Sequence, residues 1–308
     1  MKQDQARLQA MLEAAVASDR AGDLPAAVAG YRRILRRVPD HPPTLHRLGV
    51  ACLKQRDMSA ALRCLRRLMA LAPDKWQVLE SLGDALQGEG RPASAASTCR
   101  RGLSLGGDAR SLGAKIDSVR FAIGNLKDAK PCMLRGDLLG YALAQAQAHG
   151  LVLEFGVASG ASLRFLSSIT HDSVFGFDSF EGLPETWRSG FEAGAFARPA
   201  VPAGLPPNAQ LVIGLFADTL PRFREQHADG VHFAHIDCDL YSSTKTIFDM
   251  LGDRFAPGTV LVFDEYMNYP GWREHEHRAF AEFIEATGKS FECLGWTRGG
   301  TQVAVRFT

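Results

Sequence analysis

The sequence predicts two domains: an α-helical solenoid of repeats over residues 1–129, and a doubly wound, Rossmann-like α/β domain over residues 130–308. Three observations predict this architecture. The first hundred residues repeat with a period of 34 residues, the second half alternates apolar strand-like runs with helical stretches, and acidic residues follow several of those runs. The length of 308 residues agrees with two domains of ordinary size.

Composition and charge are those of an ordinary globular protein. Apolar residues make up 46% of the chain, charged residues 22%, and the net charge is +1, so nothing global points to nucleic acid or to a membrane. No apolar run is long enough to span a bilayer, and the N-terminus lacks the apolar stretch of a secretion signal. We therefore expect a cytoplasmic protein. The six cysteines form no CxxC pair, which indicates neither a zinc site nor a disulfide framework.

The repeats are visible as small residues, prolines and turns that recur at intervals of 34. The clearest recurrences are Leu48-Gly49 with Leu82-Gly83, Ala27 with Ala61 and Ala95, and Pro39-Asp40 with Pro73-Asp74. The glycines and alanines let two helices approach closely, and the prolines end the second helix of each unit. Over residues 6–107 the pattern resembles the tetratricopeptide repeat, and residues 108–129 are expected to cap the array.

A short repeat array usually binds a protein, and self-association of the chain is the equal alternative. Residues 1–115 carry 19 Lys and Arg against 11 Asp and Glu, and many of the arginines recur in the second helix of each unit. Such charged residues ordinarily form a solvated face of the helices. A polyanionic partner for this half stays open.

The second half shows a pattern of alternating strands and helices, which favours a mostly parallel sheet with helices on both faces. The expected strands are Leu151–Gly156, Ser173–Phe177, Leu211–Ile213, Val231–Ile236, Thr259–Phe263 and Thr301–Phe307. The expected helices begin at Ser162, Thr219, Ser243 and Glu274. Ligands of such sheets bind beyond the carboxyl ends of the strands, so the loops there are the candidate site.

The loop from Glu154 to Gly160 follows the first of these strands and opens a helix. Its glycines let the backbone approach a ligand, although the full GxGxxG fingerprint is missing. Asp178 ends the next strand, where an acid suits the two hydroxyls of a ribose. The alternative for Asp178 is a cap on the turn after the strand.

Two further strands also end in acids. Asp237 and Asp239 follow one strand, and Asp264 and Glu265 follow the other. Carboxylates that converge there repel each other unless a cation lies between them, and Mg²⁺ or Ca²⁺ prefers oxygen ligands. The alternative is that Asp237 and Asp264 bond loop amides without a metal.

Five blocks in order resemble the macrocin O-methyltransferase family, a class I methyltransferase family that acts on sugar hydroxyls. The blocks are LEFGVASGAS, VFGFDSFEGLPE, VIGLFADTLP, HIDCDLYSST and VLVFDEY. The resemblance covers about residues 150–270. It implies S-adenosyl-L-methionine as the cofactor, Mg²⁺ as the metal, and methyl transfer to a sugar or polyol hydroxyl, on a small molecule or a glycan.

The resemblance also implies roles for individual residues. The metal ligands would be Asp237, Asp264 and Glu265, although the family usually has aspartate at the last position. The residues expected to contact the cofactor are Glu154, Gly156, Ser159, Gly160, Ser162, Asp178, Ser179, Gly214, Phe216 and Asp237.

Asp239 and His275 are candidates for the base that removes the hydroxyl proton. His277, two residues after His275, is a third candidate, and both histidines have the alternative of being solvated helix positions. The stretch 181–207 is interpreted as a lid over the substrate or as a disordered insertion.

Two other function classes are consistent with part of the pattern. One is a scaffold that binds the cofactor without catalysis and uses the repeats for protein interaction. The other is an NAD-dependent enzyme, which the missing GxGxxG and the paired strand-end acids disfavour.

Overall fold

The computed structural model describes residues 2–198 and 200–308 and divides into two compact units, Met1–Gly124 and Asn125–Thr308. The domain boundary expected between residues 129 and 130 stays a prediction. In the described part of the chain, no helix is long and apolar enough to cross a membrane.

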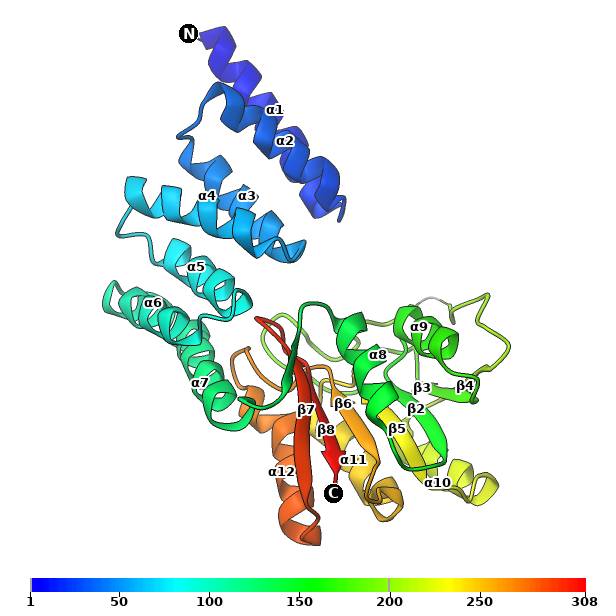
Figure 1. Cartoon of the computed structure of the whole chain (residues 1–308). Coiled ribbons are helices and arrows are strands. Elements are labelled where there is room, and N and C mark those ends of the chain that lie inside the picture. The colour runs from blue at the N-terminus through cyan, green and yellow to red at the C-terminus, as the bar shows by residue number, and fades with distance from the viewer. Residues whose placement is uncertain (1, 199) are drawn as a thin grey trace. The chain divides into compact units, whose positions relative to one another are not determined.

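The first unit consists of helices that pack in consecutive pairs and stack along the chain (Figure 1). This arrangement confirms the predicted helical-repeat fold. The pairs are α1 (Lys2–Arg20) with α2 (Leu24–Arg37), α3 (Pro42–Lys54) with α4 (Met58–Leu71), and α5 (Trp76–Gly88) with α6 (Pro92–Ser104), followed by α7 (Ala109–Asn125).

Close contacts between the paired helices explain the repeating glycines. A Cβ added to Gly49 in α3 would lie 2.8 Å from Cδ2 of Leu65 in α4. A Cβ added to Gly83 in α5 would lie 2.6 Å from Sγ of Cys99 in α6. Both members of the first contact are 34 residues before those of the second, so the period in the sequence is a period of helix packing.

Helix starts repeat in the same way. Asp23 caps α2 by accepting a hydrogen bond from the backbone N–H of Ala26, and Asp57 caps α4 by accepting one from that of Ala60, both at 3.0 Å. A side-chain cap satisfies one of the helix's unpaired first-turn donors. These aspartates therefore fix where the second helix of each of these pairs begins.

The Gly83→Ala variant is expected to destabilise the first unit by about 1–3 kcal/mol, because the added methyl forces α5 and α6 apart. Gly113→Ala is the matched control, since a Cβ at this position in α7 meets nothing within 4 Å. The control should stabilise by up to about 1 kcal/mol through helix propensity. Urea denaturation followed by circular dichroism measures both. Equal effects of the two substitutions would contradict the packing argument.

The second unit is built on one eight-stranded sheet with strand order β1-β7-β8-β6-β5-β2-β3-β4. All pairings are parallel except those of β8, which runs antiparallel to β6 and β7. The predicted, mostly parallel doubly wound sheet is thereby confirmed. The strands are β1 (Lys130–Cys132), β2 (Leu151–Phe155), β3 (Val174–Asp178), β4 (Ala209–Ile213), β5 (Val231–Ile236), β6 (Val260–Phe263), β7 (Phe291–Thr297) and β8 (Val303–Phe307).

Helices cover both faces of the sheet. Leucines of α8 and α9 pack with valines of β2, β3 and β6 on one face. Phenylalanine pairs join α10, α11 and α12 to the other face, as Phe175 with Phe223 and Phe248 with Phe263 illustrate. The elements are α8 (Arg135–Gln145), α9 (Ala161–Ile169), α10 (Phe216–Gln226), α11 (Tyr241–Leu251) and α12 (Glu276–Thr287), with short 3₁₀ turns at Gly252–Arg254 and Trp272–Glu274.

The strand order reverses between β2 and β5. From β2 the chain moves outward to β3 and β4, and then returns to place β5 on the other side of β2. The helices that follow these two strands therefore cover opposite faces, which opens a crevice at the carboxyl ends of β2 and β5. The candidate site lies at this edge of the sheet.

Candidate active site

A cavity of about 460 Å³ opens at the carboxyl ends of the strands. Its walls come from the loops after β2, β3, β4, β5 and β6, from the start of α11, and from the segment 182–196. The predicted site residues on its walls are Gly156, Asp178, Ser179, Gly214, Phe216, Asp237, Asp239 and Glu265. Residues from five strand ends, far apart in sequence, are thus brought around one space.

Asp178 fastens the loop after β2 to the end of β3. Its Oδ2 accepts hydrogen bonds from the backbone N–H groups of Val157 and Ala158, both at 2.8 Å, and its Oδ1 accepts one from that of Phe180 at 2.7 Å. These bonds are those of a turn cap, the alternative considered above. Asp178 also lines the cavity, and its three backbone hydrogen bonds leave about one acceptor site of the carboxylate unused.

Four residues predicted to contact the cofactor are not on the cavity wall formed by the described residues: Glu154, Ser159, Gly160 and Ser162. Gly160 has φ +75° at the start of α9, and Ser162 is buried in its first turn. Glu154 is fully buried inside β2. Their contacts with a cofactor remain a prediction.

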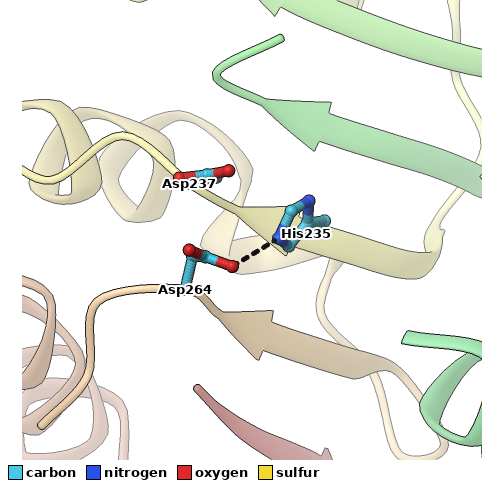
Figure 2. Close-up of side chains that lie close together, drawn as sticks. All are labelled: His235, Asp237 and Asp264. Atoms are coloured by element: carbon cyan, nitrogen blue, oxygen red, sulfur yellow. Dashed lines mark hydrogen bonds and ion pairs between the residues drawn. The ribbon is translucent and has the colours of Figure 1, made fainter. Parts of the chain in front are cut away.

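Glu154 belongs to a buried chain of charged groups that sequence reasoning missed. In it, Nδ1 of His235 lies 2.9 Å from Oε1 of Glu154, and Nε2 lies 3.4 Å from Oδ1 of Asp264. Figure 2 shows His235 turned toward Asp264, with Asp237 beside them. Burial lowers the pKa of His235, but the hydrogen bonds to Asp264 and Glu154 outweigh burial and raise that pKa to about 10. His235 is therefore an imidazolium that donates to both carboxylates.

Arg135, at the start of α8, supplies a second cation. Its Nη1 lies 3.1 Å from Oδ2 of Asp237 and 3.3 Å from Oδ1 of Asp264. Oδ2 of Asp264 accepts a further hydrogen bond from Nε2 of Gln302 at 3.2 Å. A guanidinium that bridges two carboxylates holds the ends of β5 and β6 together.

The acids around the cavity outnumber the cations. Burial and the charge of Asp264 raise the pKa of Asp237 to about 8, of Asp239 to about 6, and of Glu265 to about 9. Burial also raises the pKa of Glu276, whose Oε2 accepts a hydrogen bond from the backbone N–H of Glu265 at 3.0 Å. An excess of oxygen ligands that resist ionisation is the donor set that suits a hard divalent cation.

The geometry singles out one group of side chains that could hold such an ion. Ligand atoms of His235, Asp237 and Asp264 all lie within 4.8 Å of one another. Glu265, the third predicted ligand, lines the same cavity but is not in that group of described residues. His235 is the less suitable ligand, because both of its ring nitrogens already donate to carboxylates.

The two candidate bases lie in different surroundings. Asp239 lines the cavity and has φ +62°, a strained value for a residue with a side chain. His275 precedes α12 and is not among the described residues on the cavity wall. Its ring packs on Trp187 and Tyr269 at centroid distances of 6.2 Å, and burial lowers its pKa. The geometry therefore favours Asp239 as the base.

The segment 182–198 has its own hydrogen bonds and is not a structureless insertion. The backbone N–H of Leu183 donates to the carbonyl of Ala195, and that of Trp187 donates to the carbonyl of Phe191, at 2.9 and 3.0 Å. Oε1 of Glu185 accepts a hydrogen bond from Oγ of Ser242 in α11 at 2.5 Å. The segment thus forms one wall of the cavity, as the lid interpretation requires; residue 199 of the predicted lid lies outside the described residues.

Comparison with known proteins finds a matching family for part of the second unit. A family model described as "Methyltransferase domain" matches residues 153–266. Residues 153–266 form a methyltransferase domain. The match spans β2 to β6 and includes Gly156, Asp178, Asp237 and Asp264. The predicted S-adenosylmethionine-dependent methyltransferase is confirmed at this level.

Several solved structures are similar to parts of the chain. The calicheamicin methyltransferase CalS11 is 21% identical over 65% of this chain and 85% of its own (TM-score 0.44), and the O-methyltransferase NovP is 20% identical over 56% and 79% (TM-score 0.45). MamA from Desulfovibrio magneticus RS-1 is 20% identical over 38% of this chain and 66% of its own (TM-score 0.36). No curated protein matches the chain.

Proposed function

We propose that the methyltransferase domain transfers a methyl group from S-adenosylmethionine to a hydroxyl of a sugar or polyol, with a divalent metal ion, Mg²⁺ by preference. The observation that carries the proposal is that one cavity is lined both by the glycine loops expected to hold a nucleoside and by Asp237, Asp239 and Glu265. The match of residues 153–266 to a methyltransferase domain supports the transfer of a methyl group.

The walls of the cavity fit S-adenosylmethionine, which supplies an activated methyl group on a sulfonium. Gly156 and Gly214 line the cavity, and their φ values of +95° and +136° are ones that only glycine adopts without strain. Asp178 and Ser179 offer oxygen atoms to the ribose. Phe216 lies at the start of α10 and offers a ring to the adenine, as the matching motif implies.

Asp237, Asp264 and Glu265 would hold the metal ion, with His235 as the buried positive charge behind them. A divalent ion in this position supplies Lewis acidity and lowers the pKa of a hydroxyl that it binds. The side chain of Asp239 shares the cavity with these acids and would accept the hydroxyl proton. The contribution of the protein is to align the hydroxyl with the methyl group and to exclude water beneath the segment 182–198.

The repeats would add an interaction with a protein partner or with a second copy of the chain. A cytoplasmic location remains a proposal.

The proposed function is tested in three parts: the binding of the cofactor, the need for a metal ion and the identity of the acceptor. Calorimetry should show that S-adenosylhomocysteine binds and that NAD does not. Mass spectrometry of candidate sugars and glycans, incubated with S-adenosylmethionine with and without a chelator, should show methylation that the chelator stops. Asp264→Ala, at a predicted metal ligand that is not a predicted cofactor contact, should lose methylation and keep cofactor binding; Asp237→Ala should also lose methylation. Binding without methylation of any sugar would favour the scaffold, and binding of neither nucleotide would refute the proposal.

Arg135→Met should bind Mn²⁺ about tenfold more tightly than the unmodified protein, measured by electron paramagnetic resonance. The reason is that the guanidinium of Arg135 now holds both carboxylates that the ion needs. Arg278→Met is the matched control, since Arg278 pairs with Glu274 and Glu282 on the exposed surface of α12. Unchanged or weaker Mn²⁺ binding in Arg135→Met would show that Arg135 and the ion do not compete.

Asp239→Asn should lower kcat about a hundredfold, because the amide cannot accept the hydroxyl proton, while S-adenosylhomocysteine affinity stays within about twofold. Asp249→Asn, on an exposed position of α11, controls for the loss of one carboxylate. A His275→Gln variant tests the other candidate base. If His275→Gln is the slow variant and Asp239→Asn is not, the assignment of the base is wrong.

A further inference from the structure

Arg188 is a cation in the wall of the cavity, held by aromatic rings. The carbon of its guanidinium lies 4.2 Å from the ring centroid of Trp187, 4.5 Å from that of Phe191 and 5.2 Å from that of Tyr269. Two of these rings come from the segment 182–198, and Tyr269 comes from the stretch after β6. Three rings around one guanidinium fix its position and favour a positive charge there.

The hydrogen-bond donors of Arg188 have no acceptor among the residues 2–198 and 200–308. No side-chain hydrogen bond and no ion pair is formed by its guanidinium, and its Nε is buried without a partner. Arg135, the other arginine at this edge of the sheet, contacts two carboxylates. A buried donor without an acceptor costs free energy that a bound ligand recovers.

Arg188 shares the cavity wall with two acids, and its positive charge acts to lower the pKa of each against the larger effect of burial. Asp239 and Glu265 line the same cavity, but neither forms an ion pair with Arg188 within 4.0 Å. Both acids belong to the part of the site assigned above to the acceptor hydroxyl. The space between them and Arg188 is therefore where the acceptor would bind.

We propose that Arg188 binds an oxyanion of the methyl acceptor, so that the acceptor is an acidic sugar or polyol carrying a carboxylate or a phosphate. The planar guanidinium offers paired N–H groups that match such an anion. The inference rests on the proposed function and deepens it, since it names the class of acceptor.

S-adenosylmethionine also carries a carboxylate, and its place argues against Arg188 as the partner. The motif match places the amino-acid end of the cofactor along the loop after β2, whereas Arg188 stands with Tyr269, which follows β6. The order of strands puts β5 between β2 and β6. Arg188 is therefore a specificity residue for the acceptor, and cofactor binding should not depend on it.

The experiment compares three probes, glucose, glucuronate and glucose 6-phosphate, on the full chain saturated with S-adenosylhomocysteine and Mg²⁺. Calorimetry should show that at least one of the two anionic sugars binds about tenfold more tightly than glucose. Arg188→Met should reduce that preference to within about twofold, and Arg188→Lys should keep part of it because the charge remains.

Arg198→Met is the matched control. Arg198 is an exposed arginine of the same segment and is not on the cavity wall of the described chain, so the preference should survive its loss. Near-ultraviolet circular dichroism checks that the Arg188 variants keep the packing of Trp187, and Arg188→Gln removes the charge with the smallest change of shape.

Each outcome decides the proposal. Equal binding of glucose and both anionic sugars to the unmodified protein overturns it, and so does a preference that persists in Arg188→Met. Loss of S-adenosylhomocysteine binding in a folded Arg188→Met overturns it in favour of a cofactor role. Binding of S-adenosylhomocysteine to the unmodified protein is measured before any sugar is added. If it does not bind, the proposed function itself has failed.

Discussion

Gly156→Ala is expected to abolish binding of S-adenosylhomocysteine and to lower the free energy of unfolding of the second unit by about 4 kcal/mol. Gly156 has φ +95°, a backbone conformation that costs free energy for any residue with a Cβ. The added Cβ would also lie 1.8 Å from the carbonyl oxygen of Asp237 and 2.8 Å from its carbonyl carbon. Backbone atoms at such distances cannot give way as a flexible side chain can.

The loop after β2 has little freedom to relax. The backbone N–H of Gly156 donates to the carbonyl of Phe177, and that of Asp237 donates to the carbonyl of Phe155, at 2.9 and 2.8 Å. Moving the loop away from β5 would break these bonds and the two amide contacts of Asp178. The methyl group therefore damages the cofactor loop and the position of Asp237 together.

Tryptophan fluorescence during urea denaturation measures the stability, since Trp187, Trp272 and Trp296 lie in the second unit and only Trp76 lies in the first. Gly288→Ala provides the control. Gly288 has φ +66° after α12, but a Cβ there meets nothing within 4 Å, so the substitution carries only the backbone cost of about 1 kcal/mol. The argument fails if both variants lose the same stability and Gly156→Ala binds S-adenosylhomocysteine with unchanged affinity.

Local patterns in the sequence are sufficient for much of this fold. The period of 34 residues is visible because the same close contact, Gly49 with Leu65 and Gly83 with Cys99, needs a small residue at a fixed place in each unit. The acids at the strand ends are visible because each follows a mostly apolar run. The parallel order of β2, β3, β5 and β6 follows from the helices between them.

Two strands were missed because they lack these signals. The first, β1, has three residues, of which only Cys132 is buried. The second, β7, begins at the exposed residues Phe291 and Glu292 and shows no regular alternation of burial. Both depend on pairing: β1 pairs with β7, and β7 pairs with β8, the antiparallel neighbour of β6. Propensity within a short segment does not contain that information.

The site residues that were missed act through contacts that are distant in sequence. Arg135 is 102 residues from Asp237, and no motif of the family match contains it. The position proposed for Arg188 as an anion-binding residue depends on the ring of Tyr269, which lies more than eighty residues later in the sequence. One signal in the sequence could have predicted the role of His235. It and Glu154 are ionisable residues inside two apolar strands, and a buried charge is costly unless an opposite charge pairs with it. In the sheet they are register partners on β2 and β5.

His235→Leu is expected to lower the free energy of unfolding of the second unit by about 3–5 kcal/mol. The substitution leaves Glu154 fully buried with neither carboxylate oxygen bonded, since Oε2 already lacks a partner and Oε1 loses Nδ1 of His235. Asp264 loses one of its bonds but keeps Arg135 and Gln302. The main cost is thus an unpaired carboxylate in the centre of the sheet.

The double variant Glu154→Leu/His235→Leu isolates that cost. Replacing both members of a buried ion pair with apolar side chains is often neutral for stability, whereas removing one member is not. The double variant should therefore recover most of the stability that His235→Leu loses, although it should not recover methyl transfer if His235 is the charge behind Asp264. Denaturation of the unmodified protein, the two single variants Glu154→Leu and His235→Leu, and the double variant gives the coupling between the two residues directly. A double variant as unstable as His235→Leu would mean that His235 stabilises the fold by filling space. Its charge would then matter for Asp264 and the metal ligands rather than for the fold.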